Sequence, residues 1–339
     1  MALSSHPARA QAEQGHGRRP DAGLVVRCGP ILRRGIEVQV QPNAQRQDDT
    51  RTAGTTAPVV SFEFFPPKTA AMAESLWQSV LQLAPLGPRF VSVTYGADGS
   101  TRDHTHALVS RLRQQTRLCV APHLTCVGAP RGEVLDIARR YWDEGIRHIV
   151  ALRGDPPAGA AGYVPHPDGF HHAADLVRGL RGVGDFDISV AAYPEVHPEA
   201  PGAAADLDNL RRKIDAGASR AVTQFCFDTD IWLRFRDACA RAGITVPIVP
   251  GILPITRFTQ VQRFAARCGA SVPAVLARRF EGLDGDPETH RLIAAAVAIE
   301  EVETLQRHGV REFHFYTLNR ADLSFAVCHA LGLRAAAAT

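Results

Sequence analysis

Short apolar segments alternate with longer amphipathic ones from Val59 to the end of the chain. The short segments are rich in β-branched residues and lack helical periodicity, which is typical of strands buried on both faces. They are Val59–Phe65, Arg89–Tyr95, Leu118–Leu124, His148–Leu152, Ile188–Tyr193, Arg220–Cys226, Val246–Ile252 and Glu312–Thr317.

Apolar residues at helical spacing occupy the stretches between these strands. They predict helices at Ala71–Leu83, His104–Gln114, Glu133–Trp142, Asp206–Asp215, Ile231–Arg241, Arg257–Arg267 and His290–His308, with a closing helix at Ala321–Leu331. Eight alternating units predict an α/β fold, namely a (β/α)8 TIM barrel that forms a single domain over residues 58–335.

Residues 1–57 differ from the rest because they are rich in Arg, Gln, Gly and Pro and show little apolar periodicity. We expect a disordered or poorly ordered extension. Arginines outnumber acidic residues up to Gln47, which is compatible with a transit peptide, whereas the apolar centre of a secretory signal is missing.

The composition narrows the class of protein. The chain has 339 residues, 45% hydrophobic and 22% charged, with a net charge of +3, and no apolar run approaches the roughly 18 residues of a membrane span. Because the positive charge is spread out, we expect small-molecule substrates and no nucleic-acid or membrane partner. The seven cysteines include no CxxC pair, which indicates reduced thiols and a cytoplasmic location.

Alternation along the first strand separates two faces. Phe62 and Phe64 share one face, and if they pack under the helices, Glu63 points into the barrel. A buried carboxylate is costly unless it is paired or protonated. The structural alternative for Glu63 is a salt bridge to a neighbouring arginine.

The run Arg147–Asp155, RHIVALRGD, ends a strand in charged and flexible residues. Arg153, Gly154 and Asp155 fall at the carboxyl edge of the sheet, where α/β proteins handle ligands. Asp155 could instead be a simple helix N-cap. Two carboxylates at one rim, Glu63 and Asp155, favour acid–base or electrostatic catalysis.

Asp206, Asn209 and Lys213 form one helix stripe, which is either a solvated face or a set of ligands for a ribose and a phosphate. A metal site built on His104 and His106, or on His123 and Cys126, is not favoured, because no carboxylates at suitable spacing complete it. No G-x-G-x-x-G or P-loop is present, so a dinucleotide would have to be held by the barrel itself.

Several long runs resemble one known family. They are SFEFFPPKT, FVSVTYGADGSTRDHT, APHLTC, GIRHIVALRGD, FDISVAAYPEVHPEA, LDNLRRKIDAGASRAVTQFCFD, VPIVPGILPITRF and GVREFHFYTLNRADLSFAVCHALG. Together they cover nearly everything from Val59 onward and resemble methylenetetrahydrofolate reductase, a flavoenzyme of one-carbon metabolism. The resemblance implies a barrel that binds FAD without a Rossmann fold. It also implies reduction of 5,10-methylenetetrahydrofolate to 5-methyltetrahydrofolate with NADH or NADPH, a step that serves methionine synthesis.

The resemblance also implies site residues. Glu63 would be the general acid that opens the imidazolidine ring of the substrate, and Asp155 would lie by the flavin and pterin and tune both. The implied FAD contacts are Thr94, His123, Leu152, Arg153, Gly154, Asp155, Ala173, Tyr193, His197, Asp206, Asn209 and Lys213. The implied substrate contacts are Glu63, Gln224 for the pterin, Gln260 and Arg320 for folate or nicotinamide, and Phe264 as a stacking ring. We expect no metal, and a homo-oligomer.

The chain departs from the family pattern in the loop 156–171, which is longer than in bacterial members, and at His172, which replaces an aromatic residue. The chain ends soon after the barrel, so we do not expect the regulatory domain of the larger eukaryotic enzymes. Two other classes stay open. One is an FAD-dependent barrel oxidoreductase for another substrate, such as an amino acid, and the other is a binding relative without a cofactor.

Overall fold

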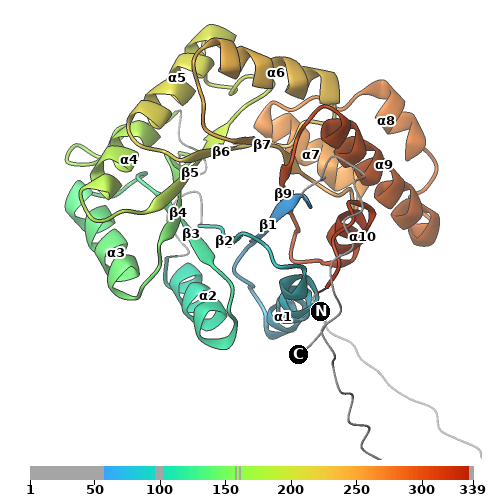
Figure 1. Cartoon of the computed structure of the whole chain (residues 1–339), viewed down its shortest axis with the longest axis horizontal. Helices are drawn as coiled ribbons and strands as arrows, with labels where there is room; N and C mark the ends of the chain where they lie inside the picture. The colour runs from blue at the N-terminus through green and yellow to red at the C-terminus, as the bar shows by residue number, and fades with distance from the viewer. Residues whose placement is uncertain (1–56, 96–101, 157–158, 160–161, 336–339) are drawn as a thin grey trace, which may run out of the picture. The chain divides into compact units, whose positions relative to one another are not determined.

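Parallel strands form a ring that is surrounded by helices (Figure 1). The computed structural model describes residues 57–95, 102–156, 159 and 162–335. The strands are β1 (Val59–Phe64), β2 (Val91–Val93), β3 (Val120–Thr125), β4 (His148–Leu152), β5 (Asp187–Ala192), β6 (Arg220–Thr223), β7 (Ile248–Val249), β8 (Gly251–Ile252) and β9 (Glu312–Tyr316). The predicted TIM barrel is confirmed. The expected extension, 1–57, lies outside the described residues except for Ala57.

The ring closes through a strand that is broken in two. β7 pairs with β6, and β8 pairs with β9, so the two pieces together occupy the place of the predicted strand Val246–Ile252. Pro250 lies between them and has no N–H for a ladder, which accounts for the break. Its carbonyl still accepts a hydrogen bond from the backbone N–H of His314 at 3.0 Å.

Most predicted helices agree with the structure to within a few residues. The helices are α1 (Ala70–Leu83), α2 (Arg102–Gln115), α3 (Arg131–Asp143), α4 (Ala173–Arg181), α5 (Ala203–Asp215), α6 (Thr229–Arg241), α7 (Phe258–Cys268), α8 (Ala274–Arg279), α9 (Pro287–Arg307) and α10 (Asp322–Ala330), with a 3₁₀ turn η1 (Ala84–Leu86). The short helices α4 and α8 were not predicted, because neither is long enough to show a clear apolar repeat.

The two faces of β1 have the predicted environments. Phe62 and Phe64 are buried in a cluster with α1 residues such as Leu76 and with Val302 of α9. On the opposite face, the Ser61 hydroxyl lies 2.7 Å from Nδ1 of His314, inside the ring. Glu63 therefore faces the barrel interior, as the alternation indicates.

A charged network lies where the strands begin. Arg220 is 4% exposed, and its guanidinium pairs with Asp187 at 3.3 Å and with Glu312 at 3.5 Å. His148, at the start of β4, donates to or accepts from the Ser189 hydroxyl at 2.9 Å. The ring of Phe90 packs against His148 above this network, with 4.2 Å between centroids. These side chains fill the amino-terminal end of the barrel, which leaves the carboxyl rim for a ligand.

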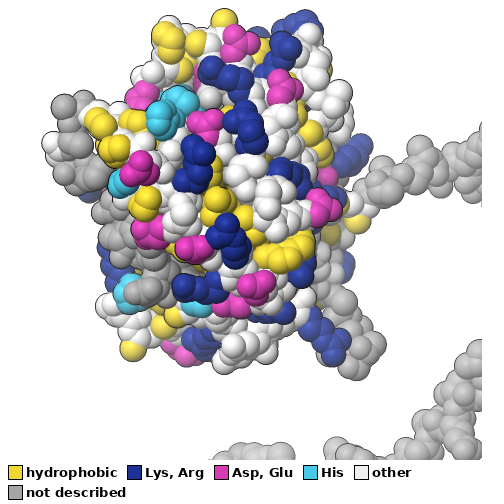
Figure 2. All heavy atoms as spheres, turned by 90° about the vertical axis from the view of Figure 1, so that its left-hand side faces the viewer, with side chains coloured by type: hydrophobic (Ala, Val, Ile, Leu, Met, Phe, Trp, Pro, Cys, Tyr) yellow, Lys and Arg dark blue, Asp and Glu magenta, His cyan; other side chains and the backbone are white. Residues whose placement is uncertain are grey.

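The outer surface carries mixed charges. Figure 2 shows Lys and Arg side chains interspersed with Asp and Glu on the face it presents. Among the described residues, the structure contains no helix long and apolar enough to cross a membrane.

The junction of β8 with its neighbours has no room for a side chain at Gly251. A Cβ there would overlap the Thr223 carbonyl oxygen and the Tyr316 ring, which are themselves joined by a 2.8 Å hydrogen bond. We expect Gly251→Ala to lower the free energy of unfolding by about 1–3 kcal/mol through overpacking.

Urea unfolding of both variants measures this effect. Gly132→Ala is the matched control, because Gly132 lies in α3 and a Cβ there meets no atom within 4 Å. The control should unfold within about 1 kcal/mol of the parent, on the stabilising side. Equal stability of the two variants would contradict the close packing at Gly251.

Candidate cofactor and substrate site

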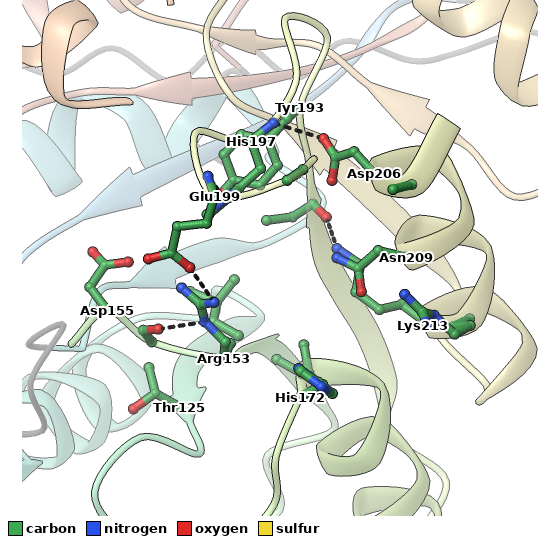
Figure 3. Close-up of a pocket in the computed structure, with 18 of the residues that line it drawn as sticks. Thr125, Arg153, Asp155, His172, Tyr193, His197, Glu199, Asp206, Asn209 and Lys213 are labelled. Carbon is green, nitrogen blue, oxygen red and sulfur yellow. Dashed lines mark hydrogen bonds and ion pairs between the residues drawn. The ribbon is translucent and has the colours of Figure 1, made fainter. Parts of the chain in front are cut away.

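A cavity of about 530 Å³ lies where β4 and β5 end, against α5 (Figure 3). Most of the predicted cofactor residues line it, namely Leu152, Arg153, Gly154, Asp155, Ala173, Tyr193, His197, Asp206, Asn209 and Lys213. Thr94 and His123 do not line it. The strand-end turn and the α5 stripe, which were separate sequence features, thus belong to one site.

Lys213 is a buried cation in the cavity wall. Its side chain is 4% exposed, and Nζ donates to the Ala191 carbonyl at 2.5 Å. Burial lowers the Lys213 pKa to about 8, and the nearby Asp206 carboxylate opposes this shift only in part. The ammonium has no ion pair within 4 Å among the described residues. A negatively charged ligand in the cavity would offset the cost of burying it.

The loop from β5 to α5 is held in a strained shape over the cavity. Val196 has φ 71, which is unfavourable for a β-branched residue. The backbone N–H of His197 donates to Asp206 Oδ2 at 2.9 Å, which ties the loop to α5. The His197 ring accepts from the Glu199 N–H through Nδ1 at 3.1 Å, so Nε2 carries the proton of the neutral ring. Burial, and then the neighbouring Arg153, lower the pKa of His197.

The two charged residues of the Arg153–Asp155 turn have different surroundings. Arg153 pairs with Glu199 at 2.6 Å, and its guanidinium lies over the Tyr163 ring, 4.3 Å from the centroid. Gly154 has φ 87, a conformation that favours glycine. Asp155 is exposed at the cavity edge (Figure 3) and forms no ion pair within the described part of the chain. The N-cap interpretation of Asp155 is wrong, because α4 begins only at Ala173.

Glu63 lies between two histidines inside the barrel. Its Oε2 is 3.3 Å from His123 Nε2 and 3.7 Å from His314 Nε2. Burial raises the Glu63 pKa, but hydrogen bonding and charge from His123 and His314 outweigh burial and lower it to about 2. The arginine salt bridge considered for Glu63 is therefore wrong, since its partners are histidines. His123 contacts Glu63 rather than the cavity of the other predicted cofactor residues.

The remaining substrate residues do not line this cavity. Gln224 follows β6, and its Oε1 accepts from the Phe225 N–H at 3.0 Å. Gln260 and Phe264 lie on α7, exposed and half-buried respectively. Arg320 lies between β9 and α10 and lines a second cavity. The structure does not bring these four residues into the first cavity.

Other cavity residues escaped the sequence analysis. Tyr95, Thr125, Glu199 and Arg212 line the cavity, and Tyr163 supports Arg153. Thr125 ends the β3 strand and Arg212 adjoins Lys213, so both had a positional signal. No such signal pointed to Glu199, because this residue pairs with Arg153, which lies 46 positions away in the sequence.

The histidines considered as metal ligands have other surroundings. His106 pairs with Glu144 at 3.3 Å. No group of three or more His, Cys, Asp or Glu side chains in the described ranges is arranged to hold a metal ion.

Comparisons with known proteins agree with one another. Residues 49–332 match the family model described as methylenetetrahydrofolate reductase. The chain is 56% identical over 275 residues to a 5,10-methylenetetrahydrofolate reductase of Pectobacterium carotovorum, covering 81% of this chain and 90% of the relative. It is 55% identical over 275 residues to the Escherichia coli protein of the same name, covering 81% and 91%.

A solved structure supports the fold alone. It is an uncharacterized protein from Clostridium thermocellum that binds two copies of 5-methyl-5,6,7,8-tetrahydrofolic acid, with a TM-score of 0.53 and 13% identity. The match covers 81% of this chain and 95% of the other.

The buried ammonium of Lys213 makes ligand binding pH-dependent. With a pKa of about 8 in the free site, Lys213 is mostly neutral at about pH 9. A diphosphate favours the charged form and raises this pKa, so binding of a diphosphate-containing ligand at about pH 9 should take up roughly one proton. At about pH 6.5 the lysine is already charged and the uptake should vanish.

Titration calorimetry in buffers of different ionisation enthalpy measures the uptake. Lys213→Met should abolish it, whereas Lys68→Met, which changes the chain's other lysine at an exposed position, should retain it. Proton uptake that persists in Lys213→Met would assign it to another group.

Proposed function

Since the chain belongs to the methylenetetrahydrofolate reductase family and acts as a 5,10-methylenetetrahydrofolate reductase, we propose that FAD in the cavity of Lys213 links hydride from NADH or NADPH to the folate. The observation that carries this proposal is the buried Lys213 ammonium, which lines a 530 Å³ cavity and forms no ion pair with any residue that the structure describes. Bound FAD would supply a carrier that accepts hydride from one substrate and passes it to the other.

The cavity residues fit the groups of FAD. Lys213 and Arg212 would face its diphosphate, because both are cations on the same wall of the cavity. Asp206 and Asn209 supply an acceptor and a donor for hydroxyl groups. Tyr193, whose ring packs against His197 with 4.6 Å between centroids, offers an aromatic wall. The cavity therefore combines cationic, polar and aromatic contacts of the kinds that a dinucleotide needs.

Asp155 would act on charge that develops in the substrate. Its carboxylate is at the cavity edge and is not neutralised by an ion pair in the described part of the chain. A negative charge there stabilises the 5-iminium cation, the form of the folate that accepts hydride. Arg153 does not cancel this charge, because its guanidinium is engaged by Glu199.

Glu63 would deliver the proton that opens the substrate ring, together with the histidines. The carboxyl is ionised near neutral pH, since its pKa is lowered to about 2. A general acid needs a proton, and the rings of His123 and His314 are the adjacent groups that can supply one. We propose that Glu63 passes a proton from this pair to the ring nitrogen of the folate whose bond breaks.

The remaining proposals concern partners and location. Gln224 would contact the pterin, while Gln260, Phe264 and Arg320 would contact the rest of the folate or the nicotinamide. Either NADH or NADPH would be the hydride donor, and we propose a cytoplasmic homo-oligomer serving methionine synthesis. The cysteines in the described ranges are free thiols, which fits a reducing compartment.

The visible spectrum of the purified protein tests the flavin proposal. We expect yellow protein that releases FAD on denaturation and whose reduced form is reoxidised by 5,10-methylenetetrahydrofolate. Bound FMN, or colourless protein that cannot take up FAD, would overturn the flavin proposal. Reoxidation by another acceptor and not by the folate would overturn the assignment of the substrate.

Replacing Glu63 should separate the two halves of the reaction. Glu63→Gln keeps the size of the side chain but removes its titratable oxygen. Because general acid catalysis contributes about 10²–10⁴-fold, reoxidation of the reduced enzyme by the folate should slow by that order. Reduction by NAD(P)H should change far less, since it requires no ring opening.

Stopped-flow measurements of each half-reaction distinguish the roles. Glu144→Gln is the matched control, because Glu144 also lies 3.3 Å from a histidine, His106, and does not line the cavity. It should leave both rates unchanged. Equal losses in both half-reactions of Glu63→Gln would indicate damage to the fold, and no loss with the folate would leave Glu63 a structural carboxylate.

A further inference from the structure

Tyr163 lies outside the cavity of Lys213 and packs against the turn that carries Asp155. Its ring lies under the Arg153 guanidinium, whose Cζ is 4.3 Å from the ring centroid. We propose that Tyr163 is a positioning residue, which holds Arg153 on Glu199 and thereby keeps the Asp155 carboxylate free to act on the folate. The inference rests on the proposed role of Asp155 and extends it to a residue that does not line the cavity.

The Arg153 guanidinium has a choice of two carboxylates. It pairs with Glu199 at 2.6 Å, and it lies two positions from Asp155 in the same turn. Figure 3 shows the Asp155 carboxylate on the same side of the cavity as this pair. Burial is the main cause of the raised pKa of Tyr193, but Asp155 raises it further and Arg153 opposes the shift. Because both charges act on one ring, a guanidinium released from Glu199 can turn to Asp155.

The ion pair alone is a weak constraint on this choice. The side chains of Arg153 and Glu199 are 23% and 44% exposed. Ion pairs at such exposure contribute little, because water and salt screen them. A guanidinium over an aromatic ring gains a contribution of similar size, and the stacking also sets the plane of the guanidinium. Tyr163 therefore supplies a second contact that directs Arg153 toward Glu199.

Tyr163 is itself held by the end of β3. Its hydroxyl lies 3.9 Å from Sγ of the buried Cys126, and this Sγ donates to the Arg153 carbonyl at 3.4 Å. Cys126 thus contacts both the ring that supports Arg153 and the backbone of Arg153. Burial, followed by the charge and hydrogen bonding of Cys126, raises the pKa of Tyr163, so the phenol stays neutral and does not become a third anion for the guanidinium.

The chain after Tyr163 is attached to two helices. The Asp168 carbonyl accepts the N–H of Arg131, the first residue of α3, at 2.8 Å. Phe170 is 3% exposed and belongs to the same buried cluster as Leu176 of α4. These anchors fix the position of the Tyr163 ring independently of Arg153, so the ring can determine where the guanidinium lies.

The two half-reactions of the holoenzyme test the inference. Tyr163→Leu keeps an apolar side chain but removes the ring face, so Arg153 should pair with Asp155 for part of the time. Reoxidation of the reduced flavin by 5,10-methylenetetrahydrofolate should then slow about three- to tenfold. The reduction potential of the flavin should rise, because reduction adds negative charge and a less negative turn opposes it less. Tyr163→Phe keeps the ring and should restore the wild-type rate and potential.

A double substitution separates positioning from damage to the fold. In Asp155→Asn no carboxylate is left in the turn for Arg153 to neutralise, so adding Tyr163→Leu should change the folate rate by less than about twofold. Trp77→Leu is the matched control, because the Arg111 guanidinium lies 4.1 Å from the centroid of the Trp77 ring and neither residue lines the cavity. This control should leave both half-reactions and the potential unchanged.

Three results would overturn the inference. One is an unchanged folate rate in Tyr163→Leu, and another is a loss that Tyr163→Phe shares. The third is an equal loss from Tyr163→Leu with and without the Asp155 carboxylate. An Asp155→Asn variant with an unchanged folate rate and an unchanged potential would instead overturn the proposed role of Asp155, on which the inference rests.

Discussion

The burial of one carboxylate inside the barrel constrains the arrangement around it. The Glu63 side chain is only 20% exposed, so the cost of shielding its charge from water must be offset by neighbours on other strands. His123 on β3 and His314 on β9 provide this balance, and Ser61 holds the far side of the His314 ring. These contacts exist only because β1 and β9 pair in register, with Ser61 opposite His314. The chemistry of the rim therefore depends on how the barrel closes.

The two ends of the barrel use charge in opposite ways. At the amino-terminal end, the buried Arg220 pairs with Asp187 at 3.3 Å and with Glu312 at 3.5 Å. At the carboxyl rim, Lys213 is buried beside a cavity and has no ion pair within the described ranges of the chain. The ion pairs offset the cost of burying Arg220, whereas burial of Lys213 remains costly until an anion binds. The buried charge that lacks an ion pair therefore lies at the cavity, where binding of an anion can offset its cost.

Short-range periodicity in the sequence correctly predicted which face of a strand or helix a residue occupies. Strand alternation placed Glu63 in the interior, and helical spacing grouped Asp206, Asn209 and Lys213. It could not predict contacts set by the neighbouring strand, such as the Glu63–His123 pair, because strand alternation alone does not fix the heights of side chains in a barrel.

Other differences between the predicted and the observed elements have local causes that hydrophobic periodicity does not capture. The seventh predicted strand is broken at Pro250, because a residue without an N–H interrupts the ladder. The helices α4 and α8 have 9 and 6 residues, too few to establish a period against their surroundings. The Arg153–Glu199 pair joins two loops, whose conformations follow no periodic rule.

The pairing of β1 with β9 also sets the order in which the chain can assemble. The Thr317 hydroxyl donates to the Glu63 carbonyl at 2.6 Å across 254 positions of sequence. During synthesis, β1 is made early, yet this edge has no native partner until β9 leaves the ribosome. Barrel closure is therefore a late event, and an incomplete chain presents an open strand edge that can pair with other chains. For this protein, the Glu63 site therefore cannot form before β9 has been synthesised.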